Sequence, residues 1–449
     1  MSSGLQGRRA EVRAVRLHGL RLRRDMDSLR FRALWALIAA ADHGSTNQAA
    51  RALNLTQPAV SHAIKMIEEQ LGVPLFHRRS KGMVLTDLGE IFSKRVRQAL
   101  NHLLAAENEI ARTTTVPTIK ESIRGLHRRV TRQQLITLVS VTERRSVQYA
   151  SQETGYSQSV IWHVLRELRG MVGETLVEHR PSGISLSASG EILVRYAKLA
   201  FAELRYAHDE LAAFRGNLSG RVVIGALPLS RTILLPRAIA QMAPRYPNLE
   251  FTLVDGPYNT LLSALRCGDI DLIVGALRTP APADDVIEEV LFREPLSIAA
   301  DIHNPLVQRS GLTLAELADQ QWIMPIRGTP TRSIFEALFV KQGLAPPKKI
   351  IECSSLIATR ALLLESNYLT FISRSQIHYE EQFRILAALN VEGLADTERP
   401  IGVTTRADAS VSPGVRELIH RLHTVSRNLY QRPLPLSDGA RDEALQDAV

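Results

Sequence analysis

One predicted helix near the N-terminus carries four polar side chains on the same side: Gln57, Ser61, His62 and Lys65. Amide, hydroxyl and imidazole groups can hydrogen-bond to base edges in a DNA major groove, and an ammonium group suits a phosphate. The other side of the helix is apolar, at Val60, Ile64, Ile67 and Leu71. The pattern predicts a helix that packs on one side and offers the other side to DNA.

The segments before this helix predict a helix-turn-helix arrangement. From Ser28 an apolar stripe of helical period runs to a stop signal at His43-Gly44, on Leu34, Leu37, Ile38 and Ala41. A short second helix is expected from Thr46 to Leu53, followed by a tight turn at Asn54-Leu55. Thr56 is placed to cap the third helix, and Pro58 stands in its first turn, where a missing N–H is not needed. The alternative is a plain helical bundle whose polar side is only solvated.

Basic residues follow the third helix. After Gly72 the segment PLFHRRSKGMVLT predicts two short strands around Ser80-Lys81-Gly82. Such a wing places three cations beside a DNA backbone: Arg78, Arg79 and Lys81.

The stretch LRFRALWALIAAADHGSTNQAARALNLTQPAVSHAIKMIEEQLGVPLFHRRSKGMVLTDLG resembles the DNA-binding head of LysR-type transcription regulators. The T-Q-P-A-V-S turn, the E-x-x-L-G-V-P-L-F run and the basic wing carry the resemblance. It implies that Gln57, Pro58, Ser61 and His62 face bases, while Thr46, Lys65, Arg78 and Lys81 contact or approach phosphates. His62 departs from the family, which very often has Arg there, so the base preference at this position is in doubt.

The resemblance also implies a long linker helix from Thr86 that pairs with a second subunit. An apolar face suited to such pairing is present at Leu88, Ile91, Phe92, Val96, Leu100, Leu103 and Leu104.

Charge supports a polyanion partner for the first half of the chain. The 449 residues carry a net charge of +9, and all of this positive excess lies within residues 1–218. A basic half can displace counterions from DNA, although a soluble surface is the plainer explanation. The basic residues of the N-terminal arm either touch DNA phosphates or reflect the choice of start codon, because Met26 precedes the first helix.

The chain repeats itself at a shift of 101 residues. Without any gap, the shift aligns Ser45 with Ser146, Gln57 with Gln158, His62 with His163, Gly72 with Gly173 and Gly89 with Gly190. A second, diverged winged head is therefore predicted. This second head has lost several residues that would contact DNA in the first. Trp162 stands at the position of Ser61, Ser159 at that of Pro58, Ser182 at that of Lys81 and His179 at that of Arg78. It is either mainly structural or makes a weak second DNA contact through Arg166, Arg169, Arg180 and Arg195.

The second half alternates strands and helices, which predicts two α/β lobes that bind a small molecule at the carboxyl ends of their strands. It resembles the LysR effector domain. Its segments GALPLSRTILLP, VDGPYNTLLSALRCGDIDLIVGALR and EEVLFREPLSI resemble most the galactose-binding-protein regulator subgroup. Loops at strand ends nominate the effector contacts Pro228, Ser230, Thr232, Arg278, Arg327, Gly328, Thr329, Thr331, Ser354, Ser355 and Ser373. For the hydroxyls the alternative is helix capping, and for the arginines, including Arg374, it is ion pairing between lobes.

The expected fold class is a mainly α winged helix-turn-helix, in two copies, plus an α/β two-lobed effector domain like the periplasmic binding proteins. The predicted boundaries are 1–25 for a basic arm, 26–86 for the winged head, 87–113 for a linker helix, 114–127 for a linker, 128–190 for the second head, 191–216 for its linker helix, 219–430 for the effector domain and 431–449 for a tail.

The function expected from these parts is a LysR-type regulator that senses a sugar or an organic acid and changes its DNA binding through oligomer rearrangement. Its expected partners are an operator duplex, RNA polymerase if it activates, and one or three further copies of the chain. No apolar run could cross a bilayer and no secretory signal is evident, so a cytoplasmic, nucleoid-associated protein is expected. No catalytic motif, metal site or cofactor is expected, and Cys267 and Cys353 are predicted to be buried thiols. The competing classes are an adaptor that ignores DNA and an enzyme on the two-lobed fold.

Overall fold

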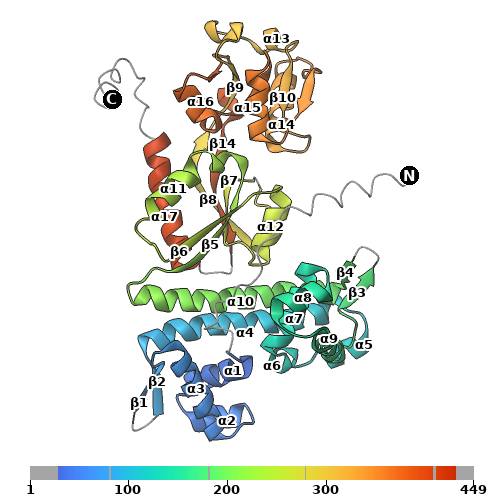
Figure 1. Cartoon of the computed structure of the whole chain (residues 1–449), viewed down its shortest axis with the longest axis vertical. Coiled ribbons are helices and arrows are strands. Elements are labelled where there is room, and N and C mark those ends of the chain that lie inside the picture. Colours follow the sequence, from blue (N-terminus) through green and yellow to red (C-terminus); the bar gives the residue numbers. More distant parts are fainter. Residues whose placement is uncertain (1–28, 80–81, 181–182, 279, 408–410, 431–449) are drawn as a thin grey trace. The chain divides into compact units, whose positions relative to one another are not determined.

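The computed structural model describes residues 29–79, 82–180, 183–278, 280–407 and 411–430 (Figure 1). The predicted arm at 1–25, the tail at 431–449 and the wing residue Lys81 lie outside these ranges. Contacts along the chain divide it into two compact units. The first comprises Met1–Gly225, Tyr246–Asp271 and Ala409–Val415, and the second comprises Ala226–Arg245, Leu272–Asp408 and Arg416–Val449. Within the described ranges no helix is both long and apolar enough to span a membrane.

The first unit begins with the predicted three helices and wing. They are α1 (Phe31–His43), α2 (Thr46–Ala52), α3 (Gln57–Leu71) and the antiparallel strands β1 (Phe76–Arg79) and β2 (Gly82–Leu85). The turns form where the sequence predicted them, because Gly44 and Asn54 adopt left-handed backbone at φ 60° and 54°. The predicted apolar stripe of α1 is buried at Leu34, Leu37 and Ile38.

The caps of these helices differ in one respect from the prediction. Thr56 occupies the N-cap position of α3, but its side chain makes no capping hydrogen bond. By contrast, Thr86 caps the long helix α4 (Asp87–Thr113) and accepts a hydrogen bond from the Gly89 backbone N–H at 2.9 Å. Gly89 must be glycine because an added Cβ would lie 2.0 Å from the carbonyl oxygen of Leu75.

A second set of elements follows with nearly the same lengths. It consists of α7 (Arg132–Arg144), α8 (Val147–Thr154), α9 (Gln158–Val172), β3 (Val177–Arg180), β4 (Gly183–Leu186) and α10 (Ala188–Phe214). Apart from the end of α8, every bound lies 101 residues after its counterpart in the first set. The strand register repeats too, since Phe76 pairs with Leu85 and Val177 with Leu186. The predicted second linker helix therefore starts at Ala188, three residues earlier than expected.

The segment predicted as a linker at 114–127 contains helical structure. It forms α5 (Pro117–Ser122) and leads into α6 (Leu126–Arg129). Ile119, Ile123 and Leu126 are buried in the same hydrophobic core as the helices on either side. Apolar burial therefore orders a segment that the sequence pattern treated as a connection.

The effector part contains two five-stranded sheets. In the first, the order is β6 (Leu249–Val254), β5 (Gly220–Ala226), β7 (Leu272–Ala276), β14 (Arg399–Arg406) and β8 (Val286–Glu294). In the second, the order is β11 (Ile350–Glu352), β10 (Trp322–Met324), β12 (Leu369–Ser373), β9 (Leu296–Asp301) and β13 (Leu386–Ala388). The helices and 3₁₀ turns are η4 (Pro228–Arg231), α11 (Leu234–Met242), α12 (Tyr258–Arg266), η5 (Pro305–Gln308), α13 (Leu314–Leu317), α14 (Pro330–Lys341), α15 (Leu356–Leu364), η6 (Arg374–Ile377), α16 (His378–Gln382), η7 (Ala395–Thr397) and α17 (Pro413–Tyr430).

Two strands in these sheets were not predicted. β8 is an edge strand that carries Glu288 and Glu289, and charged residues on an edge hide the usual apolar alternation. β13 has only three residues, Leu386–Ala388, which is too short for a periodic signal.

Candidate nucleic-acid interface and effector site

Three of the predicted DNA-contacting residues form one hydrogen-bonded group on α2 and α3. The Gln57 Nε2 donates to Thr46 Oγ1 at 3.2 Å and to Ser61 Oγ at 2.8 Å. Gln57 is exposed, and Thr46 and Ser61 are half-buried. The amide is therefore held in one orientation before any ligand arrives, which reduces the entropy lost on binding.

The other predicted contacts on α3 are accessible. Pro58 and His62 are exposed, and the Lys65 side chain is 68% exposed. Lys65 Nζ lies 3.5 Å from Glu69 on the next turn, and an exposed pair of this kind is weak, so the ammonium group can still reach a phosphate. On the wing Arg79 is exposed, while the side chain of Arg78 is not described.

The equivalent surface of α9 has different chemistry. Trp162, at the position of Ser61, is 37% exposed. His163 Nε2 lies 3.3 Å from Glu167 Oε1, one turn further along. The Ser157 and Ser159 hydroxyls are 2.8 Å apart, and Ser157 caps the helix. The amide and hydroxyl constellation of α3 is therefore not repeated on α9.

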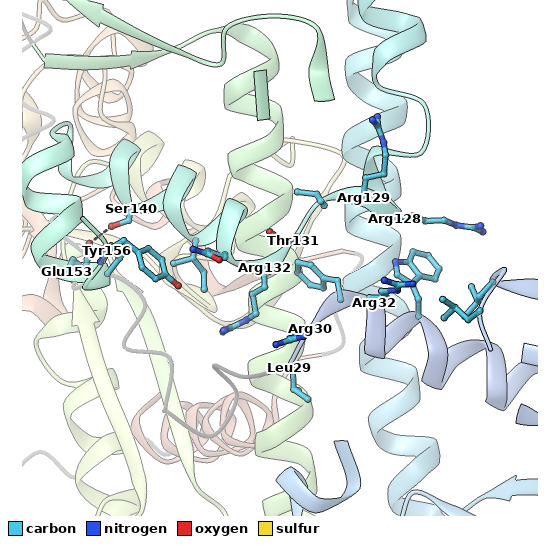
Figure 2. Close-up of a pocket in the computed structure, with 18 of the residues that line it drawn as sticks. Leu29, Arg30, Arg32, Arg128, Arg129, Thr131, Arg132, Ser140, Glu153 and Tyr156 are labelled. Atoms are coloured by element: carbon cyan, nitrogen blue, oxygen red, sulfur yellow. Dashed lines mark hydrogen bonds between the residues drawn. The ribbon is translucent and has the colours of Figure 1, made fainter. Parts of the chain in front are cut away.

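A cavity of about 1050 Å³ in the first unit collects basic side chains that sequence reasoning did not single out (Figure 2). Its lining includes Arg30, Arg32, Arg128, Arg129 and Arg132. The Arg128 guanidinium lies 5.5 Å from the ring centre of Trp35. Arg30 and Arg32 precede the other three arginines by about 100 residues, so only the fold reveals that all five line one cavity. Glu143 and Glu153 also line the cavity, so its lining carries more positive than negative side chains.

In the second unit, Arg399 joins two of the predicted effector contacts. Its Nη1 donates to Thr331 Oγ1 at 3.0 Å and its Nη2 donates to Ser373 Oγ at 2.6 Å. Thr331 follows β10 and Ser373 ends β12, and these strands are parallel neighbours, so their carboxyl ends lie at the same edge of the sheet. Nothing in the sequence around Arg399 distinguished it as a site residue.

Two charged side chains, Arg278 and Glu294, lie close enough to Arg399 to affect its pKa. Burial lowers the pKa of Arg399, and the nearby charge of Arg278 lowers it further against the opposing effect of Glu294. Burial also raises the pKa of Glu294, although hydrogen bonds from Ser375 and the charge of Arg399 act in the opposite direction. The group therefore holds two arginines near one buried carboxylate.

Several other predicted effector contacts use their hydroxyls in hydrogen bonds to the backbone of the chain itself. Ser230 is fully buried and donates to the carbonyl oxygens of Leu227 and Val274, at 2.9 and 2.8 Å. Ser355 caps α15, and Thr329 donates to the Ile326 carbonyl at 2.9 Å. These contacts support the capping alternative for Ser355, and they engage the buried Ser230 hydroxyl with two backbone carbonyls.

The remaining predicted contacts are accessible. Pro228, Gly328 and Ser354 are exposed, and Thr232 is half-buried. The Arg327 side chain is 82% exposed, with its Nε 3.9 Å from Glu352 Oε1. Arg374, considered as an ion-pair partner, bonds Glu381 at 2.8 Å.

The two cysteines are free and half-buried, so the prediction of buried thiols is only partly met. Burial raises the pKa of Cys267, which keeps it as a thiol. Among the described residues no cluster of three or more His, Cys, Asp or Glu side chains could hold a metal ion.

Comparison with known proteins gives a consistent result. Residues 215–427 match the family described as LysR substrate binding domain. Residues 31–90 and 132–191 match the family described as bacterial regulatory helix-turn-helix protein, lysR family. Together these matches span more than half of the chain.

Relatives match most of the chain. The HTH-type transcriptional regulator GalR of Pseudomonas putida is 31% identical over 384 residues, which is 86% of this chain and 94% of the relative. GbpR of Azospirillum brasilense is 26% identical over 299 residues, 66% of this chain and 87% of the relative. A solved full-length OxyR variant of Pseudomonas aeruginosa covers 66% of this chain and 95% of its own, with 20% identity and a TM-score of 0.53, and so shares the fold. A helix-turn-helix head, a two-lobed effector part and these matches establish that the chain belongs to the LysR family of DNA-binding transcriptional regulators.

Proposed function

We propose that α3 and the wing read the bases and phosphates of an operator duplex, and that the effector part senses a small organic acid near Arg399. The observation that carries the first part is the group formed by Gln57, Thr46 and Ser61. An exposed amide at the start of a helix that follows a tight turn, held by two half-buried hydroxyls, suits base edges in a major groove.

The base-reading role is tested with the full-length chain and a duplex selected from a randomised pool. Gln57→Ala and Ser61→Ala should each weaken binding about tenfold, since a good base contact contributes about 1–3 kcal/mol. Fluorescence polarisation measures this. Unchanged affinity in both variants would show that α3 does not read the bases.

The phosphate role of Lys65 has a matched control in the effector part. The Lys65 and Lys341 side chains are both 68% exposed, and each lies near one carboxylate. Lys65→Ala should lower affinity for all duplexes and reduce the slope of log K against log salt by about 1. Lys341→Ala should change neither quantity. Equal effects of the two variants would mean that only overall charge matters.

An adaptor that works only through protein contacts is the alternative function. It predicts that the full-length chain ignores every duplex, even in dilute buffer, and the same polarisation assay detects this outcome. Turnover is the other alternative. To test for it, the chain is incubated with each acid that binds, and the acid is analysed by mass spectrometry. Conversion of the acid to a product of different mass would show that the chain is an enzyme.

An acidic effector is favoured over a neutral sugar by the two arginines. Arg278 lies close enough to lower the pKa of Arg399, and an anion between like charges relieves their repulsion. Thermal unfolding of the full chain with small organic acids and with neutral sugars tests this preference. Arg278→Met should remove the stabilisation by acids, whereas Arg309→Met, at an exposed pair with Glu316, should keep it. Stabilisation by sugars alone would contradict the proposal.

The link between effector and head runs, in our proposal, through α10. Lys198 Nζ bonds Asp269 at 2.9 Å, and Arg205 Nη2 bonds Asp271 at 3.2 Å. Asp271 directly precedes β7, and Asp269 lies two residues before Asp271. A ligand that prefers one arrangement of this strand biases α10, and the orientation of subunits in a dimer or tetramer changes with it. An activating form would then contact RNA polymerase.

Residues 132–191 are, in the same proposal, a second winged helix-turn-helix unit with a mainly structural role. Its support is the repeat of helix bounds and strand register at 101 residues. The bulky Trp162 on its outer helix hinders close approach to base edges. Arg195 is bound to Glu109 at 2.6 Å, which supports a structural role for this residue.

A further inference from the structure

The long helices α4 and α10 pack through reciprocal contacts. A contact from one position of α4 to a second position of α10 is matched by a contact from the equivalent first position of α10 to the equivalent second position of α4. Arg95 Nη2 on α4 bonds Glu210 Oε1 on α10 at 2.6 Å. Tyr196 OH on α10 bonds Glu109 Oε2 on α4 at 2.7 Å. Positions 196 and 210 are the counterparts of 95 and 109 at the shift of 101 residues. Each helix therefore uses the same two equivalent positions to contact the other helix, and the two helices run antiparallel.

A second pair of contacts follows the same rule. Arg95 Nη1 bonds Glu203 Oε2 at 2.8 Å. The ring centres of His102 and Tyr196 lie 6.3 Å apart, and His102 is the counterpart of Glu203. Reciprocal contact, in which position i meets position j and j meets i, is the property of an interface with twofold symmetry.

The residues that line the cavity in the first unit, most of which are drawn in Figure 2, also come from equivalent positions of the two copies. Its lining contains seven pairs of counterparts at the 101-residue shift: Leu29 and Val130, Arg30 and Thr131, Phe31 and Arg132, Arg32 and Gln133, Trp35 and Ile136, Leu53 and Thr154, and Leu55 and Tyr156. A space bounded by equivalent residues of both copies lies where a twofold axis between those copies would pass.

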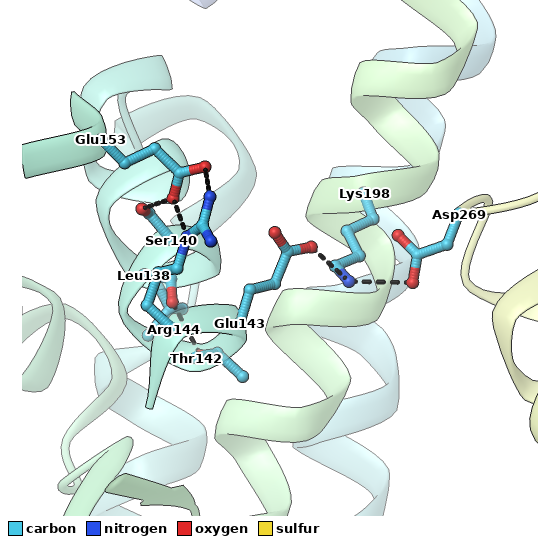
Figure 3. A network of polar contacts seen from close by, with 8 residues as sticks. All are labelled: Leu138, Ser140, Thr142, Glu143, Arg144, Glu153, Lys198 and Asp269. Carbon is cyan, nitrogen blue, oxygen red and sulfur yellow. Dashed lines mark hydrogen bonds and ion pairs between the residues drawn. The ribbon is translucent and has the colours of Figure 1, made fainter. Parts of the chain in front are cut away.

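Each copy also keeps its own internal ion pair. Arg97 bonds Asp42 at 2.6 Å in the first copy. Their counterparts Lys198 and Glu143, drawn in Figure 3, bond at 2.8 Å in the second copy. In the second copy Lys198 also bonds Asp269. The two copies are therefore complete units that pack against each other, and no helix is swapped between them.

We infer that residues 31–214 form a single-chain counterpart of a symmetric dimer, in which α10 occupies the surface of α4 that a second copy of the chain would otherwise use. Resting on the proposed function, the consequence for DNA is that each chain brings one reading helix, α3, and recognises one half-site of the operator. The paired position is held by α9, whose chemistry is unsuited to bases.

Differences between the two helices favour this pairing within the chain. Arg95 has no exposed surface and faces two carboxylates, Glu203 and Glu210. A pair of α4 helices would replace one of these carboxylates with His102. A pair of α10 helices would bury two copies of Glu203 opposite Tyr196, without an arginine at that position. Charge is therefore best matched when α4 meets α10.

Cross-linking of the full-length chain decides whether the pairing is internal. In a background of Cys267→Ser and Cys353→Ser, Glu109→Cys is combined with Tyr196→Cys and treated with a short bismaleimide. The expected product keeps the mass of one chain, 49.8 kDa, on a denaturing gel, and its peptides join α4 to α10. Neither single-cysteine variant should give a product.

A second measurement leaves Glu109 and Tyr196 unchanged. p-Benzoyl-phenylalanine at position 102 is illuminated, and the labelled peptide should come from α10 of the same chain. Products of twice the single-chain mass in either experiment, or no product from a chain that folds, would overturn the internal pairing.

The single reading helix is tested by one matched pair of substitutions. Gln57 and Gln158 are the same residue at equivalent positions of α3 and α9, and both are exposed. On the selected duplex, Gln57→Ala should weaken binding about tenfold, whereas Gln158→Ala should change it less than about twofold. Equal losses would overturn the assignment of one reader per chain. A chain that binds no duplex at all would instead refute the proposed function, while the cross-linking result would stand.

Discussion

Removal of Arg95 is the perturbation that the structure makes most informative. The guanidinium is completely buried, donates to Glu203 and Glu210 at 2.8 and 2.6 Å and lies 5.2 Å from the ring centre of Tyr206. Burial by itself would lower the pKa of Arg95, but hydrogen bonds and charges from Glu210 and Glu203 outweigh it and raise the pKa. The interaction therefore depends on all three groups staying together.

The expected loss follows from this geometry. In Arg95→Met two carboxylates lose their common cation, and breaking a buried pair in this way costs about 3–5 kcal/mol of the free energy of unfolding. For a unit of this size that corresponds to a fall in melting temperature of about 10 °C. Differential scanning calorimetry of the full chain measures the fall, and hydrogen exchange of peptides from α4 and α10 locates it.

A neighbouring arginine provides the control. Arg97 bonds Asp42 at 2.6 Å, but both side chains are 46% exposed, so Arg97→Met should cost no more than about 1 kcal/mol. Adding Glu203→Gln to Arg95→Met should recover part of the loss, because the amide needs no counter-ion. If the melting temperature of Arg95→Met is no lower than that of Arg97→Met, the argument that burial strengthens the interaction of Arg95 with Glu203 and Glu210 is refuted.

Three further outcomes are expected. Gly89→Ala should lower the melting temperature of the full chain, because its Cβ would lie 2.0 Å from the Leu75 carbonyl oxygen; an unchanged circular dichroism melt would contradict the packing. The hydrogen bond from Arg144 lowers the pKa of Glu153, so its stabilisation is present at neutral pH and is lost as pH falls through the folded-state pKa. Glu153→Gln should therefore make stability less sensitive to acid, and an identical pH profile would count against this. Arg399→Lys keeps the charge but not the two-pronged reach, so calorimetric titration with a stabilising acid should show about tenfold weaker binding; unaltered affinity would exclude Arg399 as the anchor.

The internal pairing changes what is expected of an operator. A symmetric dimer reads two equal half-sites, so its DNA target repeats with twofold symmetry. A chain that supplies its own partner for α4 has one reading helix on one side of the pseudo-twofold axis. Any palindrome in the target would then require two chains joined through surfaces outside α4.

Local patterns in the sequence determined the elements and their repetition. The apolar stripe of α1, the turns at Gly44 and Asn54 and the polar side of α3 are written in residues a few positions apart, and each was predicted correctly. The 101-residue shift predicted the second set of elements closely, because equal spacing of glycines and apolar residues folds into equal helices and strands.

Only the tertiary structure decided which surfaces meet. Arg95 and Glu203 are separated by 108 residues, and Arg399 and Thr331 by 68. A periodic pattern tells which side of a helix is buried, but many partners could bury it equally well. The choice depends on shape and charge across the whole interface, which residues close in sequence do not encode.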